Sequence, residues 1–499
     1  MALPISALTA LGAYPAANPS GYTSNVGTVT SVSGTGAVSG LTLTGSVTTS
    51  GNLTLGGTLS LTSGNVTTAL GFTPVNKAGD TLTGNLIING NTTFGDAVGD
   101  VGTFADQMGL DYTTDTLPTS RPALSLNFVN SGVLDSRVTF TRGSTATFVG
   151  SNGLIQTAAI NAPRFDFDPV TLAAKGLLIE EPRTNLLTYS AEFDNASWVK
   201  GTGGPISANT IVSPDGATNA DAYTWATSTS SYAFLSQTVS ATSNIANTFS
   251  VWLKRPTGSG SRTIRLTISD VTTSTGNSAS FTVTETWQRF AFTRTSGTST
   301  ASVGVGFTVG LTGTPIAAVD VLHVYGAQLE AGAFATSYIP TVASQVTRSA
   351  DAASITGTNF SNWYNQTEGT ISFNYTGTPT AVAQLWVPSA VGGPTIADND
   401  GGNNVRVSLR SVAYVDTGGT ITTAGLLYKT AFGYKQGDYA SSTNAGTVQV
   451  SSNATAPTVQ TGVTLGSLGG TSSFLNGHIR SIAYYNTRLS NTILQGITK

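Results

Sequence analysis

Six tryptophans are the side chains in this sequence best suited to recognise a ligand. An indole ring offers a planar apolar face to the C–H face of a sugar, while a few polar neighbours fix the orientation of the hydroxyls. Trp225 is preceded by Tyr223 and followed, after a Thr/Ser-rich turn, by Tyr232; Trp363 and Tyr364 lie between two asparagines. The sequence therefore predicts that these five aromatic residues contact a glycan, with core packing as the alternative for each.

Acid–base cleavage of a polysaccharide needs two carboxyl groups that flank one bond. Glu180 and Glu181 are adjacent, so on a strand they face opposite sides. Asp166 and Asp168 share a strand face but have no neighbouring base. Neither of the two histidines lies in a Ser–Asp pattern suited to nucleophilic catalysis. We therefore predict that the chain is not an enzyme.

Oxygen ligands for a cation gather at Asp398 and Asp400, in a string (DNDG) similar to part of a calcium loop. The closing Glu and the full ligand spacing of such a loop are missing. A turn is the preferred interpretation, with a calcium or sugar loop as the alternative. Cysteine is absent, which excludes disulfides and thiolate metal sites. No cofactor is predicted, and a structural calcium ion stays open as an alternative.

The composition limits the fold and the partners. Charged residues make up 9% of the 499 residues, against about 25% in ordinary globular proteins. Such low charge argues against an intrinsically disordered protein of the common, highly charged kind. It favours β structure, with Thr on strands and Gly and Asn in turns. A net charge of −3 without a basic run argues against nucleic-acid binding. No apolar run is long enough for membrane insertion.

Residues 26–64 form a low-complexity tract in which Val and Leu alternate with Thr and Ser and glycine interrupts regularly. This pattern predicts very short strands with tight turns. One such chain has a single apolar stripe and cannot bury it alone, whereas three chains around a common axis can. The alternative is a flexible Gly/Ser/Thr linker, but its regular apolar positions disagree with free coil.

An internal repeat carries a resemblance to a known family. Residues 9–15 (TALGAYP) recur as 68–74 (TALGFTP), and the second copy runs on to residue 86 as VNKAGDTLTGNL. That run resembles the short segment in many tailed-phage fibres that knits three chains along a shaft. The resemblance implies a repetitive trimeric β shaft over residues 26–95. It also implies a virion-anchoring segment over residues 1–25, whose apolar residues are Leu3, Ile5, Leu8, Leu11 and Tyr14.

Residues 96–123 are expected to form a junction, and residues 124–175 a β-rich neck. Two strings, GLLIEEPRTNLLTYS from residue 176 and YGAQLEAGAFATSYIP from residue 325, then frame a region with strand signals every 10 to 15 residues. They resemble the strings that frame a carbohydrate-binding jelly-roll module in phage tail proteins. This implies a jelly-roll over residues 176–345, in which Asp320 stands where related modules hold a structural calcium ion.

Residues 346–499 are similar to the concanavalin-like, laminin-G-like sandwiches, on the strings TISF at residue 370 and FLNGHIRSIAYY at residue 474. Near the C-terminus, Ser490 is placed to cap a short helical turn. The likeness is to a fold and does not fix a ligand.

The sequence thus predicts an all-β protein with an elongated trimeric β shaft followed by two β-sandwich (jelly-roll) domains. As a function it favours a homotrimeric phage fibre, located on the virion and acting at the host cell surface. The N-terminus would bind tail, baseplate or capsid proteins, and the C-terminal modules would bind a host surface polysaccharide without covalent chemistry. The alternatives are a structural capsid or tail decoration fibre without specific glycan binding, and a polysaccharide-depolymerising tailspike.

Overall fold

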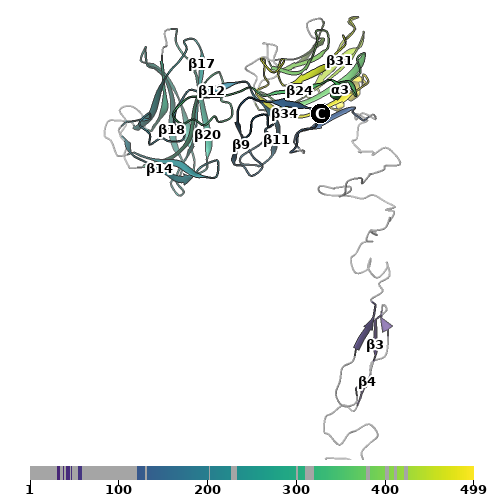
Figure 1. The fold of residues 1–499 in the computed structure, drawn as a ribbon, viewed down its shortest axis with the longest axis horizontal. Coiled ribbons are helices and arrows are strands. Elements are labelled where there is room, and N and C mark those ends of the chain that lie inside the picture. The colour runs from purple at the N-terminus through teal and green to yellow at the C-terminus, as the bar shows by residue number, and fades with distance from the viewer. Residues whose placement is uncertain are drawn as a thin grey trace, which may run out of the picture. The chain divides into compact units, whose positions relative to one another are not determined.

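The computed structural model describes residues 31–33, 37–38, 41–44, 46–47, 54–58, 121–129, 132–201, 203–225, 233–298, 302–309, 320–377, 383–398, 404–409, 413–420 and 425–499. The chain divides into two units, Met1–Asp106 and Gln107–Lys499. Nearly all regular elements are strands (Figure 1), which confirms the predicted all-β class. No helix in the described part of the chain is long and apolar enough to cross a membrane.

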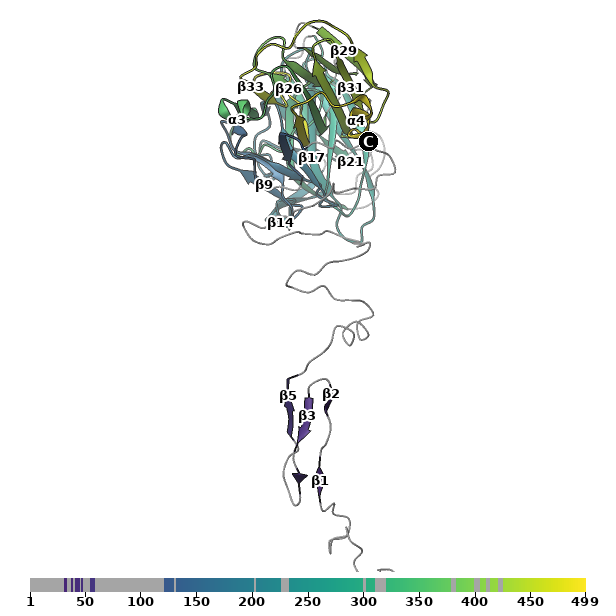
Figure 2. The same cartoon turned by 90° about the vertical axis from the view of Figure 1, so that its right-hand side faces the viewer.

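The first unit contains short antiparallel strands within the predicted shaft (Figure 2). They are β1 (Val32–Ser33) paired with β4 (Ser46–Val47), and β3 (Leu41–Thr44) between β2 (Ala37–Val38) and β5 (Thr54–Gly57). Leu55 is 64% exposed in the single chain. Association into a trimer stays a prediction, and the five predicted anchoring residues, Leu3, Ile5, Leu8, Leu11 and Tyr14, lie outside the described residues.

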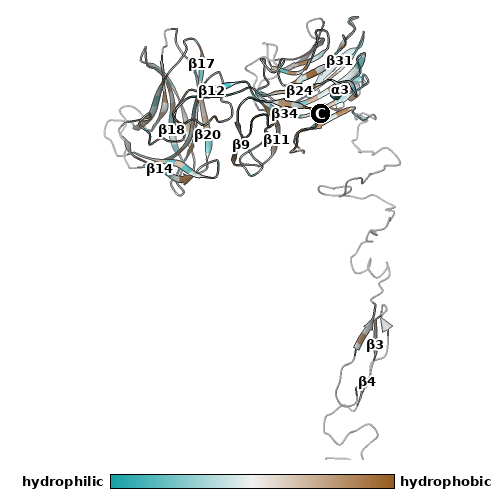
Figure 3. Ribbon diagram, viewed as in Figure 1, coloured by the Kyte–Doolittle hydropathy of each residue, from teal (hydrophilic) through white to brown (hydrophobic). Residues whose placement is uncertain are grey.

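In the second unit, two five-stranded antiparallel sheets form the middle sandwich. Sheet G, as it is called below, has the order β13 (Val199–Gly201), β16 (Ala233–Ser240), β21 (Ser302–Val309), β18 (Arg262–Asp270), β19 (Thr275–Val283). Sheet H has the order β14 (Gly203–Val212), β15 (Thr218–Trp225), β22 (Asp320–Ala331), β17 (Ala246–Lys254), β20 (Gln288–Thr295). Alternate residues of both sheets meet in one hydrophobic core. Figure 3 shows hydrophobic and hydrophilic residues mixed along these strands, as expected when one face is buried.

Two larger sheets form the C-terminal sandwich. One contains β10 (Phe165–Phe167), β11 (Ala174–Ile179), β34 (Gly477–Tyr485), β25 (Glu368–Thr376), β30 (Leu427–Lys435), β31 (Tyr439–Thr443) and β32 (Gln449–Ser451) in that order, and β6 (Leu124–Asn127) also pairs with β34. The other contains β29 (Ala413–Thr420), β28 (Asn404–Leu409), β27 (Pro394–Asp398), β26 (Ala383–Pro388), β33 (Gly462–Leu465), β24 (Ala352–Thr356) and β7 (Thr139–Thr141).

The smaller elements complete the second unit. Two-stranded sheets pair β8 (Ala146–Val149) with β9 (Ile155–Ala158), and β12 (Arg183–Asn185) with β23 (Val346–Arg348). The described helices are the single turn α3 (Thr358–Ser361) and α4 (Asn491–Gly496). The Ser490 side chain accepts a hydrogen bond from the backbone N–H of Ile493, which confirms the predicted N-cap.

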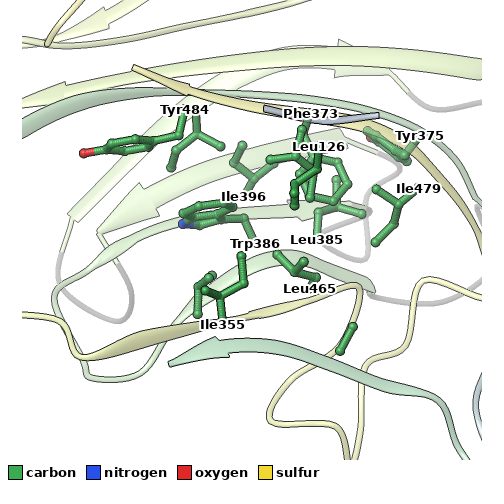
Figure 4. Close-up of a cluster of buried hydrophobic side chains, with 14 of the residues drawn as sticks. Leu126, Ile355, Phe373, Tyr375, Leu385, Trp386, Ile396, Leu465, Ile479 and Tyr484 are labelled. Atoms are coloured by element: carbon green, nitrogen blue, oxygen red, sulfur yellow. The ribbon is translucent and has the colours of Figure 1, made fainter. Parts of the chain in front are cut away.

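The expected neck does not stand apart from the C-terminal sandwich, and this corrects the boundaries drawn at residues 124–175 and 176. Leu126 pairs with Ile482, and Leu177 pairs with Ile479, so β6 and β11 both extend the sheet that contains β34. The apolar residues of these strands enter the same core as Trp386 (Figure 4). The partner strand lies about 300 residues after β11 and about 356 residues after β6 in the chain, and local periodicity contains no information about such distant pairing.

Candidate functional site

The outer face of sheet G is a partly exposed surface of the middle sandwich that carries many hydroxyl side chains. Its opposite face supplies Leu235, Leu266 and Val305 to the core, all essentially buried. Because side chains alternate along a strand, the residues between them point outward. These outward residues are Phe234, Ser236, Thr238, Thr263, Arg265, Thr267, Ser269, Ser278, Ser280, Thr282, Gly304, Gly306 and Thr308.

The register of the strands aligns these residues in rows across the sheet. One row runs through Phe234, Thr308, Arg265 and Ser280, since Phe234 pairs with Thr308, Thr308 with Arg265, and Arg265 with Ser280. Neighbouring strands are about 4.8 Å apart, so Phe234 and Arg265 are separated by roughly 10 Å. A ligand of disaccharide size can therefore contact both residues at once.

The next row consists of Ser236, Gly306, Thr267 and Ser278. Hydroxyl groups both donate and accept hydrogen bonds, which suits them to polyhydroxylated ligands. Gly306 lies against the backbone of Leu235 and Ser236, so a side chain at this position would collide with β16. The centre of the face is consequently lined by small side chains, and backbone and hydroxyl groups are within reach of a flat ligand.

Phe234 provides the aromatic surface on this face. A side chain at Gly201, its partner on β13, would collide with the Phe234 ring, so the ring lies directly above Gly201. The ring is half-buried and keeps one apolar area next to the hydroxyl rows. This combination of one aromatic ring with several hydroxyl groups and one guanidinium is suited to holding a sugar chain.

The structure places the predicted residues Tyr223 and Trp225 in the core, where both side chains are 0% exposed. Their rings lie 6.1 Å apart, and the guanidinium of Arg262 lies 5.5 Å from the Trp225 ring. Burial raises the pKa of Tyr223 to about 12. The prediction of glycan contact is therefore corrected for these two residues, because β15 turns both toward sheet G from inside the sandwich. Tyr232 lies outside the described residues.

Trp363 and Tyr364, predicted to contact a glycan, are each only 8% exposed. Trp363 donates its indole N–H to the backbone carbonyl of Asn359, and Tyr364 stacks on Phe360 at 4.4 Å. Both belong to the core of the C-terminal sandwich. The turn α3 folds back on that core, which removes these rings from solvent and corrects the prediction.

The predicted metal ligands are not brought together. The Asp320 carboxylate lies 2.6 Å from Arg255 and 3.3 Å from Arg262, so two guanidinium groups already compensate its charge. Asp398 ends β27, and Asp400 lies outside the described residues. Within the described ranges there is no group of three or more His, Cys, Asp or Glu side chains arranged to hold a metal ion.

The most strongly charged cluster of the second unit is buried and paired. Glu180 lies 2.6 Å from Arg348 and 2.8 Å from Arg164, while Asp351 pairs with Arg164 and with Arg142 at 3.1 Å. Burial alone would raise the pKa of Glu180, but the opposite charges of Arg348 and Arg164 outweigh it and hold the pKa well below its usual value. This cluster connects β11 to the segment after β23 and serves packing rather than acid–base chemistry.

A cavity of about 600 Å³ opens beside the β8–β9 hairpin. Three phenylalanines, Phe148, Phe165 and Phe167, line it together with Gln156 and other small or apolar residues. None of the residues that line it is charged or titratable. It therefore offers a hydrophobic contact but no catalytic group.

Comparison with protein-family models finds no match, and comparison with curated proteins finds none either. Solved structures give matches of low similarity. One is the enzymatically active domain of tailspike protein 4 of bacteriophage CBA120, with 13% identity, a TM-score of 0.24, and coverage of 30% of this chain and 21% of that one. This chain thus spans only about a fifth of the tailspike domain.

Two further matches are similar in strength. The sialidase of Trypanosoma rangeli shows 12% identity and a TM-score of 0.24, with 30% of this chain and 26% of the sialidase covered. The CBM22-1 xylan-binding domain of Xyn10C from Paenibacillus barcinonensis shows 16% identity and a TM-score of 0.23, with 33% of this chain and 100% of the domain covered. TM-scores this low assign neither a ligand nor an activity to this chain.

The prediction that the chain is not an enzyme is contradicted and withdrawn, because an enzymatically active tailspike domain and a sialidase are among the solved structures that it matches. The residues of sheet G were not singled out from the sequence. The signal that identifies them is the alternation at residues 264–269, where Arg265, Thr267 and Ser269 fall between three isoleucine or leucine residues.

Proposed function

We propose that the protein is a glycan-binding fibre of a tailed phage and that the outer face of sheet G is its glycan-binding surface. The observation that carries the proposal is the arrangement of Phe234, the serine and threonine hydroxyls and Arg265 in aligned rows on one exposed sheet face. Hydroxyl groups and an aromatic ring complement the hydroxyl and C–H faces of a sugar chain. Tyr223 and Trp225 of β15 pack in the core beneath this face.

The virion context is supported by the segment at residues 68–86 and its resemblance to the segment that knits three chains in tailed-phage fibres. Short strands with exposed Leu55 agree with a shaft that buries its apolar stripe between chains. Three copies of the face on one fibre would multiply a weak single-site affinity through avidity.

Light scattering on the full chain measures its mass in solution. We expect three times the mass of one chain; a monomer would contradict the proposal that the protein is a trimeric fibre.

The binding surface is tested by blocking it. Thr267 is half-buried on the outer face of the central part of sheet G, and a Thr267→Tyr substitution adds a bulky ring there while keeping a good β-forming residue. We expect the full-length variant to lose binding to the surface polysaccharides that the wild-type chain binds on a bacterial glycan array. Thr157→Tyr on β9, an exposed position of the second unit, is the matched control and should bind as wild type.

A folded Thr267→Tyr variant that binds glycans as well as the wild type would overturn the assignment of the site to sheet G. Circular dichroism and the urea midpoint of both variants establish that each is folded. A wild-type chain that binds no glycan on the array would contradict the glycan-binding function itself.

A further inference from the structure

Arg265 is the one charged side chain on the outer face of sheet G among the described residues. The strands of this sheet contain three other charged residues, Lys200, Arg262 and Asp270. All three alternate with the outward positions and therefore belong to the opposite side: Lys200 pairs with Leu235, and Asp270 is 0% exposed. The face is thus cationic at a single point.

Arg265 differs in its partners from the arginines of the second unit that form ion pairs. Arg164 and Arg348 are buried against Glu180, and Arg255 is paired with Asp320. Arg265 donates from Nη2 to the hydroxyl of Ser278, a neutral neighbour on β19. Within the described residues no carboxylate shares the face with it. Its positive charge is left without an opposite charge on the face where we propose that a glycan binds.

The surroundings of Arg265 restrict what can approach it. Thr308 and Ser280 flank it in the same row, and Ser278 lies one row further along β19. Hydroxyl groups on both sides allow hydrogen bonds to ring hydroxyls, while the planar guanidinium matches the two oxygens of a carboxylate. Roughly 10 Å away, two strands across, Phe234 offers an apolar surface to an adjacent sugar ring.

We propose that Arg265 recognises the carboxylate of an acidic sugar residue, so that the glycan bound by sheet G is an acidic polysaccharide of the uronic-acid type. This inference rests on the proposed glycan-binding function of the same face. One guanidinium balances one negative charge, which agrees with a carboxylate. A phosphate monoester carries close to two charges at neutral pH and would normally find a second cation.

The test uses the full-length chain on an array of bacterial surface glycans, in which each acidic glycan is printed beside its carboxyl-reduced form. Arg265→Gln removes the charge and keeps hydrogen-bonding capacity, and Arg265→Lys keeps the charge without the planar fork. Lys435→Gln is the charge-matched control, since Lys435 is 55% exposed on the C-terminal sandwich. Thr267→Tyr blocks the face irrespective of charge.

We expect wild-type binding to acidic glycans, about tenfold weaker binding to their reduced forms and a loss of similar size in Arg265→Gln, as for one charge-assisted hydrogen bond. Arg265→Lys should fall in between, and Lys435→Gln should match the wild type. Selective binding to neutral glycans, or Arg265→Gln binding equal to wild type, would overturn the inference about the acidic sugar. The Thr267→Tyr variant would still test separately whether sheet G is the glycan-binding surface. A wild-type chain that binds no glycan would contradict both the glycan-binding function and the recognition of an acidic sugar by Arg265.

Discussion

Glu180→Gln is the substitution that most sharply tests how the second unit is stabilised. The carboxylate accepts hydrogen bonds from the backbone N–H and the hydroxyl of Ser337, both at 2.7 Å, and lies 2.6 Å from Arg348 and 2.8 Å from Arg164. Glutamine keeps the size of the side chain but removes its charge. The five-residue cluster of Arg142, Arg164, Arg348, Glu180 and Asp351 then changes from one excess positive charge to two.

The size of the effect follows from burial. The side chains of Arg164 and Arg348 are 0% and 1% exposed, so neither can recover the lost interaction from water. Removing one partner of a buried ion pair typically costs about 3–5 kcal/mol, because the remaining charge stays buried and uncompensated. We therefore expect Glu180→Gln to lower the free energy of unfolding of the second unit by about that amount.

Urea unfolding followed by tryptophan fluorescence measures this difference. Glu368→Gln is the matched control, because the partner of Glu368, Lys435, is 55% exposed and lies 3.3 Å away; such surface pairs contribute about 0–1 kcal/mol. A Glu180→Gln variant whose stability stays within about 1 kcal/mol of wild type would refute the reasoning that the charge of Glu180 is needed to compensate the buried Arg164 and Arg348.

Because the pKa of Glu180 is lowered from about 4.5, its stabilising contribution is complete above that pH and is lost as the pH falls below it; urea midpoints should therefore decline in acid for the wild type and decline less for Glu180→Gln. Trp225→Ala should destabilise the middle sandwich by about 3–5 kcal/mol, while the folded fraction binds glycan as the wild type does, which an affinity measurement below the unfolding transition checks. Gly477→Ala should cost about 1–3 kcal/mol in urea unfolding, because the added Cβ would collide with the carbonyl oxygen of Thr376 on β25.

The architecture of the sandwiches was largely predictable, since strand alternation is a local property. Leu266 and Ile268 alternate with Thr267 and Ser269, and this pattern alone predicts a strand with one buried face. The pairing of β6 and β11 with β34 was not predictable, because many strands in this chain share the same composition. Only the folded structure shows which edge is free to accept them.

The candidate site illustrates a second limit of the sequence. Tyr223 and Trp225 looked like ligand contacts because aromatic residues border a polar turn. Both, however, lie at alternate positions of β15 whose side chains face the core. Aromatic residues occur both in hydrophobic cores and at sugar-binding surfaces. The residue types and their spacing in the sequence therefore do not distinguish a core residue from a ligand contact. Arg265 was missed for the opposite reason. In the sequence it looks like an ordinary solvent-exposed arginine, and only the strand register shows that it lies in one row with Phe234.

A crystal structure of the full chain with a polysaccharide fragment selected on the array is the most direct test of whether the outer face of sheet G binds a glycan. We expect sugar density over the row that contains Phe234 and Arg265, with hydroxyl groups of Ser236, Thr267 or Ser280 in hydrogen-bonding contact. Sugar density elsewhere, for example in the cavity lined by Phe148 and Phe165, with sheet G empty, would contradict it.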